Sequence, residues 1–315
     1  MAAIISRSTT SPSVSASSVS ASSVSALSAV PSASTILTSV KSTKDSDPPT
    51  IRFTNTQDLF DIINSTTGDF LTVINVSPNQ FTEIERERDT GGKTGQKKQY
   101  RKFRFRRYNT NSRILIITIP TRLHEILHLG LYSPYRRTRF RAEKDHPGGD
   151  GAEGDSTGGP WPERGGAGNW PTLVIESGYS ETLPELQKDM RWWFQASNYQ
   201  VKIVILAKFD DQQHHILLEK WEEEISSPQG AITRSRAAAI SQNGILNPVK
   251  RQSITITRDE TTNPVSYNVT RGALVLGFRL LFLRDPGPQE GDFVLSIQSL
   301  QLYAEKVWAQ LPRSD

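Results

Sequence analysis

The chain has 315 residues, of which 36% are hydrophobic, and it carries a formal net charge of +4 with no cysteine. This length suffices for one large or two ordinary domains, and the lack of cysteine excludes disulfides, thiol chemistry and thiolate metal sites. The sequence contains no apolar run of membrane-spanning length and no signal-peptide core. We therefore expect an intracellular protein, nuclear or cytoplasmic, with no membrane partner.

Residues 1–48 are rich in serine, contain no aromatic residue and have no acidic residue before Asp45. A segment of this composition cannot bury enough apolar area to offset the entropy lost on ordering, so we expect a disordered tail. The composition also resembles, faintly, an organelle transit peptide, although Arg7 is its only basic residue before Lys41.

After the tail, periodicity and turn residues predict alternating helices and strands. A short helix is expected at 56–63, with Thr56 as its cap, and the state of the charged segment 83–88 stays open. Thr182 and Glu185 have the spacing of a capping box at the start of another helix. The remaining expected strands are 70–76, 114–119, 173–175, 201–209, 215–221 and 253–257, and the remaining helices 121–132 and 294–307. Segment 274–283 fits either a strand or a helix.

Positive charge is concentrated between residues 91 and 122, which hold ten basic residues and no acidic one. The segment 100–108 alternates, which places Lys102, Arg104 and Arg106 on one strand face and Phe103 and Phe105 on the other. Basic residues interleaved with aromatic ones can neutralise phosphates and stack on bases, so this face is a candidate for binding DNA or RNA. The alternative is a solvated face whose charges protect a sheet edge from aggregation.

One candidate site is the HExxH pattern formed by His124, Glu125 and His128 on a predicted helix. In that pattern two imidazoles hold zinc and the glutamate acts as a base. The extended form of the motif is absent, because Leu131 and Pro134 stand where it needs glycine and histidine. A zinc metalloprotease is therefore one alternative, and a chance match on an ordinary helix is the other.

A second candidate site consists of the carboxylates Asp155 and Glu176, with Glu125. Glu176 ends an apolar run, where a carboxylate is costly unless something pairs with it. Oxygen ligands of this kind suit Mg²⁺, which can activate a water molecule against a phosphodiester.

Five segments carry a family resemblance: PTRLHE at 120–125, EGDS at 153–156, WPTLVIESGYSE at 170–181, LQKDMRWW at 186–193 and VKIVI at 201–205. Together they resemble a set of mostly uncharacterised fungal proteins related to the restriction-endonuclease branch of the PD-(D/E)XK nuclease-like superfamily. The resemblance covers roughly residues 70–225. It implies a mixed sheet flanked by helices, with Asp155 and Glu176 as metal ligands and Glu125 near the metals.

The sequence departs from this family at one position, because Gly178 stands where the family has a lysine two residues after the second acid. A lysine there would stabilise the charge of the transition state. On the following helix, Lys188 is expected to point away from the apolar stripe. Arg191, on the flank of that stripe, is the expected substitute.

The sequence as a whole predicts an α/β protein of restriction-endonuclease-like fold. Its expected parts are the tail at 1–48, a core at 49–225, a polar excursion at 226–252 and C-terminal strands and a helix at 253–311. The expected function is Mg²⁺-dependent hydrolysis of DNA or RNA, or nucleic-acid binding by a catalytically degenerate relative. The alternative is a non-enzymatic interaction module that uses residues 100–108. The sequence gives no indication of oligomeric state.

Overall fold

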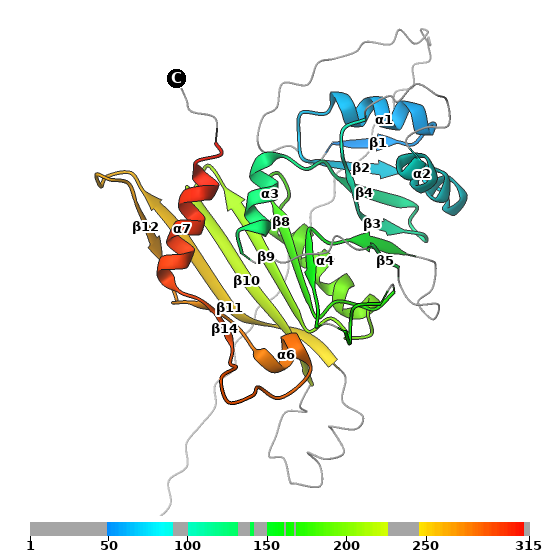
Figure 1. Ribbon diagram of the computed structural model, residues 1–315. Helices are drawn as coiled ribbons and strands as arrows, with labels where there is room; N and C mark the ends of the chain where they lie inside the picture. Colours follow the sequence, from blue (N-terminus) through cyan, green and yellow to red (C-terminus); the bar gives the residue numbers. More distant parts are fainter. Residues whose placement is uncertain are drawn as a thin grey trace, which may run out of the picture. The chain divides into compact units, whose positions relative to one another are not determined.

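The computed structural model describes residues 49–90, 100–131, 139–141, 150–160, 162–166, 168–225 and 246–311. The expected tail and most of the expected polar excursion lie outside these ranges. The described residues form a mixed α/β structure with two six-stranded sheets and one two-stranded sheet (Figure 1). None of the helices in these ranges combines the length and apolar character that crossing a membrane requires.

The first sheet has the strand order β1-β2-β4-β3-β6-β5. Its strands are β1 (Thr50–Arg52), β2 (Phe70–Ile74), β3 (Arg104–Asn109), β4 (Ile114–Thr118), β5 (Arg139–Arg141) and β6 (Gly151–Glu153). Helices α1 (Thr56–Ser65) and α2 (Pro78–Thr90) share one apolar core with β2, β3 and β4. The segment 83–88, left open by the sequence, is therefore helical.

Helix α1 is capped one residue earlier than the sequence pattern suggested. Oδ1 of Asn55 accepts a hydrogen bond from the backbone N–H of Asp58 at 2.9 Å. Asparagine is among the best N-cap residues, because its side chain satisfies a backbone donor that the first turn leaves unpaired. Thr56 is instead the first helical residue, and its side chain is buried.

The second sheet has the order β12-β11-β10-β9-β8-β7. Its strands are β7 (Ser156–Gly158), β8 (Leu173–Gly178), β9 (Ile203–Asp210), β10 (His215–Ile225), β11 (Leu246–Asp259) and β12 (Ser266–Val269). Strands β8 and β9 run parallel, and the chain passes between them through helix α4 (Leu183–Ala196). The strand β11 already begins at Leu246, so it includes the last part of the expected polar excursion.

Helices cover both faces of β8 and β9, which explains why these strands read as continuous apolar runs. Leu173 and Ile175 pack in one core with α3 (Arg122–Leu129) and α7 (Ile297–Trp308). Val174 packs in a different core with the apolar side chains of α4. Figure 1 shows α3 and α7 on one side of this sheet and α4 on the other. Alternate residues of β8 therefore face different helices.

The C-terminal segment resolves the ambiguity at 274–283 by containing both elements. Strand β13 (Leu274–Leu276) pairs with β14 (Phe293–Leu295) in the two-stranded sheet, and the short helix α6 (Phe278–Phe282) follows β13. Helix α7 begins only at Ile297, because the three residues expected at its start are used in or next to β14.

The two large sheets are joined by a very short crossing of the chain. Strand β6 belongs to the first sheet and β7 to the second, and only Gly154 and Asp155 separate them. A Cβ atom at Gly154 would lie 2.8 Å from Cγ2 of Thr157 and 3.3 Å from Cγ1 of Val174, which is too close for any other residue without displacement. Close packing at the glycine fixes Asp155 at the junction of the sheets.

Candidate functional site at the junction of the sheets

Strand β3 contains a β-bulge next to its buried basic side chains. Pairing with β4 shifts between Phe105 and Arg107, so Arg106 is an extra residue in the ladder. The aromatic side chains face the core as expected, but Arg104 and Arg106 are only 5% and 2% exposed. The prediction that they form an open face for phosphates is therefore wrong for these two residues, although Lys102 is exposed.

Arg104 links two carboxylates that the sequence marked as candidate metal ligands. Its Nη1 donates to Oδ1 of Asp155 at 2.9 Å, and its Nη2 donates to Oε1 of Glu125. Both carboxylates thus share a guanidinium, which supplies the positive charge that they would otherwise require from a metal ion.

The second carboxylate oxygen of Asp155 also has several polar contacts. Oδ2 accepts hydrogen bonds from the backbone N–H of Ser177 at 2.8 Å and from its hydroxyl at 2.9 Å, and it lies 3.2 Å from Nε2 of His124. Burial opposes ionisation of Asp155, but the interactions with His124 and Arg104 outweigh it and hold the pKa of Asp155 well below its usual range. Asp155 is a firmly ionised, internally paired carboxylate.

Glu176 is completely buried and has a different environment. Its Oε1 accepts a hydrogen bond from Nε1 of Trp193 at 2.6 Å, and Oε2 has no hydrogen-bond partner among the described residues. Burial and the negative charge of Asp155 raise the pKa of Glu176 well above its usual range. The structure therefore favours the protonated, neutral form of this side chain.

Asp155 and Glu176 make their contacts on opposite faces of β8. Asp155 binds the side chain of Ser177 and approaches His124 of α3, whereas the neighbouring Glu176 points to Trp193 of α4. A shared Mg²⁺ would need carboxylate oxygens that converge on one point. That Asp155, Glu176 and Glu125 hold Mg²⁺ stays a prediction, which these contacts do not favour.

The position of the missing lysine is tightly packed. A Cβ atom at Gly178 would lie 3.0 Å from Cδ1 of Leu186 and 3.1 Å from Oε2 of Glu181. Arg191, the expected substitute, is exposed on α4, and it is two residues, or about 200° of helical turn, away from the Trp193 that contacts Glu176. Lys208 of β9 is the register partner of Gly178, but its Nζ donates to the backbone carbonyls of Tyr179 and Phe209 at 2.5 and 2.9 Å.

A second buried ion-pair cluster surrounds Arg106 and was not foreseen from the sequence. Its guanidinium contacts Glu181 through Nη1 and Asp189 through Nε, and Nη1 of Arg107 lies 2.8 Å from Oδ1 of Asp189. One signal was present, because Asp189 lies within the helical stripe that also contains Leu186. A carboxylate in an apolar stripe requires a buried cation.

Helix α3 brings the HExxH residues together. One possible ligand atom from each of His124, Glu125 and His128 lies within 4.8 Å of the other two. Nδ1 of His128 is 2.7 Å from Oγ of Ser156, and Nε2 of His128 is 3.8 Å from Oε1 of Glu125. Burial lowers the pKa of His128, so the ring is neutral at neutral pH.

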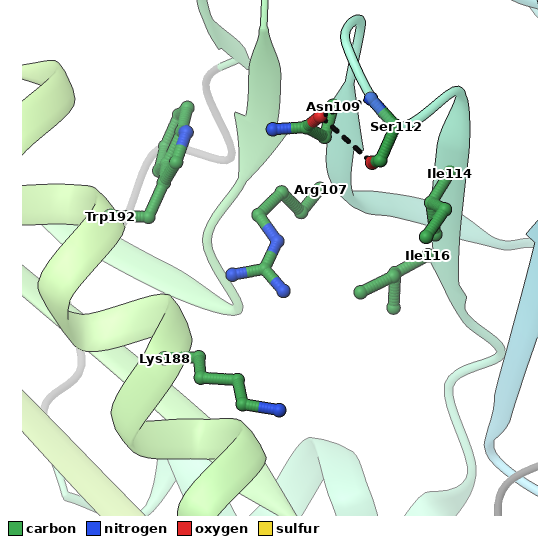
Figure 2. A pocket seen from close by; sticks show the side chains of 7 residues that line it. All are labelled: Arg107, Asn109, Ser112, Ile114, Ile116, Lys188 and Trp192. Atoms are coloured by element: carbon green, nitrogen blue, oxygen red, sulfur yellow. Dashed lines mark hydrogen bonds between the residues drawn. The ribbon is translucent and has the colours of Figure 1, made fainter.

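Figure 2 shows the side chains that line an open hollow of about 370 Å³. One of them, Arg107, also contacts Asp189 of the Arg106 cluster. One wall comes from β3, β4 and the turn between them, and the other comes from α4. The side chains that line it are Arg107, Asn109, Ser112, Ile114, Ile116, Lys188 and Trp192. As expected, Lys188 points away from the apolar core of α4, and it is exposed. The hollow thus combines two cationic groups, an indole ring and an apolar wall.

Comparisons of the chain with family models, with curated proteins and with solved structures find no match.

Proposed function

We propose that this protein is a restriction-endonuclease-like domain that binds single-stranded nucleic acid without cleaving it. The family relation rests on the sequence resemblance, and the mixed sheet with helices on both faces supports it. The conclusion about catalysis rests on one observation, which is the position of the Arg104 guanidinium between Asp155 and Glu125.

A buried guanidinium neutralises carboxylates but cannot activate water as a metal ion does. In addition, Glu176 is stabilised as a neutral acid, and Gly178 provides no cation for a developing negative charge. The carboxylates that would hold catalytic metals in the family instead connect β3, α3 and β8. Their role in this chain is to hold the two sheets together.

Binding is assigned to the hollow of Figure 2 rather than to the buried arginines of β3. Lys188 and Trp192 are one helical turn apart on α4, so an ammonium and an indole face the same space. Arg107 adds a second cation from β3, which Asp189 holds in place. A cation pair beside an aromatic ring suits a phosphate and an unpaired base, and this combination favours a single strand over a duplex.

The test measures binding of the full chain to fluorescent oligo(dT) and oligo(U) by anisotropy. Removing one stacking ring costs about 1–3 kcal/mol, so Trp192→Ala should weaken binding about 5- to 150-fold. Lys188→Glu should weaken it too, and it should reduce the salt dependence by about 0.7 log units per lost phosphate contact. The matched control is Lys306→Glu, the same charge change on the exposed side of α7.

Equal losses of oligonucleotide affinity in Lys188→Glu and Lys306→Glu, or no binding by the unaltered chain, would refute the assignment of binding to the hollow.

Cleavage is tested in parallel by incubating the full chain and the same oligonucleotides with Mg²⁺ or Mn²⁺. We expect no cleavage. Metal-dependent cleavage that disappears in Asp155→Asn would show that the protein is a nuclease and that Arg104 leaves its carboxylates during catalysis.

A further inference from the structure

We propose that His124, Glu125 and His128 form a Zn²⁺ site that fastens α3 to the edge of the second sheet. The site is separate from the hollow and does not depend on nucleic-acid binding. Histidines four residues apart on a helix project from the same side. The start of α3 is fixed by Thr121, whose Oγ1 accepts a hydrogen bond from the backbone N–H of His124 at 3.1 Å.

The distances are close to those that zinc requires. Two ligands at about 2.1 Å from a tetrahedral zinc ion are about 3.4 Å apart. Nε2 of His128 and Oε1 of Glu125 are 3.8 Å apart, which is too long for a hydrogen bond but close to a metal-bridged separation. The ligand atoms of all three residues lie within 4.8 Å of one another, so movements of about 1 Å would close the site.

A second observation is that two ring nitrogens in this group have no hydrogen-bond partner. Nδ1 of His124 and Nε2 of His128 are both buried and unpaired among the described residues, although the two side chains are only 1% and 0% exposed. Buried polar atoms are normally satisfied, so such atoms call for a specific explanation. A metal ion would satisfy the lone pair of a neutral imidazole.

The contact with Ser156 orients His128 for this role. When Nδ1–H donates to Oγ of Ser156, the lone pair of the ring is on Nε2, which faces Glu125. Metal-binding histidines commonly use the other ring nitrogen in this way, to fix the tautomer and the ring orientation. Ser156 is in β7, so the same histidine would join α3, the metal and the sheet edge.

The surrounding charges can accommodate a divalent ion. Glu125 already accepts a hydrogen bond from Arg104, but a carboxylate has about four acceptor positions and can bind a metal as well. The negative charges of Asp155 and Glu125 offset Arg104 and part of the metal charge. Two imidazoles and a carboxylate select Zn²⁺ over Mg²⁺, which prefers oxygen ligands.

The experiment uses the full chain after treatment with a chelator. Zn²⁺ is added in a calorimetric titration, and Co²⁺ serves as a visible probe of tetrahedral coordination. We expect one ion per chain, a higher melting temperature and no comparable effect of Mg²⁺. Ser156→Ala should weaken Zn²⁺ binding about 10- to 100-fold, because it removes only the group that orients His128. His128→Gln should weaken it further.

His214→Gln is the matched control, because His214 lies at the exposed turn between β9 and β10. It should bind Zn²⁺ as the unaltered chain does. The inference fails if the unaltered chain shows no saturable binding of Zn²⁺ or Co²⁺, or if folded His128→Gln binds as tightly as the His214→Gln control. Circular dichroism shows whether each variant is folded. If His128→Gln is unfolded, Zn²⁺ binding by the unaltered chain and by Ser156→Ala decides the result.

Discussion

Replacing Arg106 by methionine should remove a large part of the stability of the protein. The guanidinium is 2% exposed and contacts Glu181 and Asp189, which are 3% and 4% exposed. Burial alone would lower the pKa of Arg106, but the two carboxylates outweigh it and raise that pKa, so the residue stays charged. Removing one partner of a buried ion pair costs about 3–5 kcal/mol, against a total stability of about 5–15 kcal/mol.

The free energy of unfolding is measured by urea denaturation with tryptophan fluorescence. Lys102→Met is the control, because this exposed side chain lies shortly before β3, and its loss should change stability by less than about 0.5 kcal/mol. Combining Arg106→Met with Glu181→Gln should recover part of the loss, since Glu181 then carries no stranded charge and Asp189 keeps Arg107 as its partner. A loss below about 1 kcal/mol in Arg106→Met would refute the ion-pair interpretation.

Two further predictions concern Glu176 and Asn55. The raised pKa of Glu176 means that the folded state binds its proton more tightly than the unfolded state does. The free energy of unfolding should therefore fall as pH rises from the ordinary pKa of a glutamate to the raised pKa. The fall should be about 1.4 kcal/mol per unit of difference between the two pKa values. Glu176→Gln should remove this contribution to the pH dependence, which is measured by urea denaturation of the unaltered chain and the variant at about pH 5 and about pH 8. An equal change in the free energy of unfolding between the two pH values in both proteins would contradict the prediction. Asn55→Ala should lower the free energy of unfolding by about 1 kcal/mol through loss of the cap of α1, and an unchanged urea midpoint would contradict that role.

The sequence predicted the elements whose signals are local. The continuous apolar runs of β8 and β9 identified strands buried on both faces, and the structure confirms them. The start of α4 was predicted from Thr182 and Glu185, and Oε2 of Glu185 accepts a hydrogen bond from the backbone N–H of Thr182 at 2.9 Å. These features depend on a few neighbouring residues, so they can be read from a single sequence.

The charge network could not be predicted in the same way. Regular alternation placed Arg104 and Arg106 on one open face, but whether a face is open depends on the residues that pack against it, and here carboxylates cover both side chains. Three of their carboxylate partners, at residues 155, 181 and 189, are more than fifty positions away, and the fourth, Glu125, is 21 positions away. A polar strand face looks the same in the sequence whether it meets water or buried carboxylates from other elements. Burial of Glu176 was foreseen as a problem, but its solution by Trp193 was not.

The crossing of the chain at Gly154 and Asp155 also bears on how the protein folds and how it can be divided. Two residues leave no flexible linker between the sheets, and the ion pairs of Arg104 and Arg106 join residues on both sides of the junction. A fragment that ended near residue 150 would leave Asp155, Glu181 and Asp189 behind without the arginines that neutralise them. We therefore expect the first sheet and the second, which lie in one compact unit, to unfold in a single cooperative step.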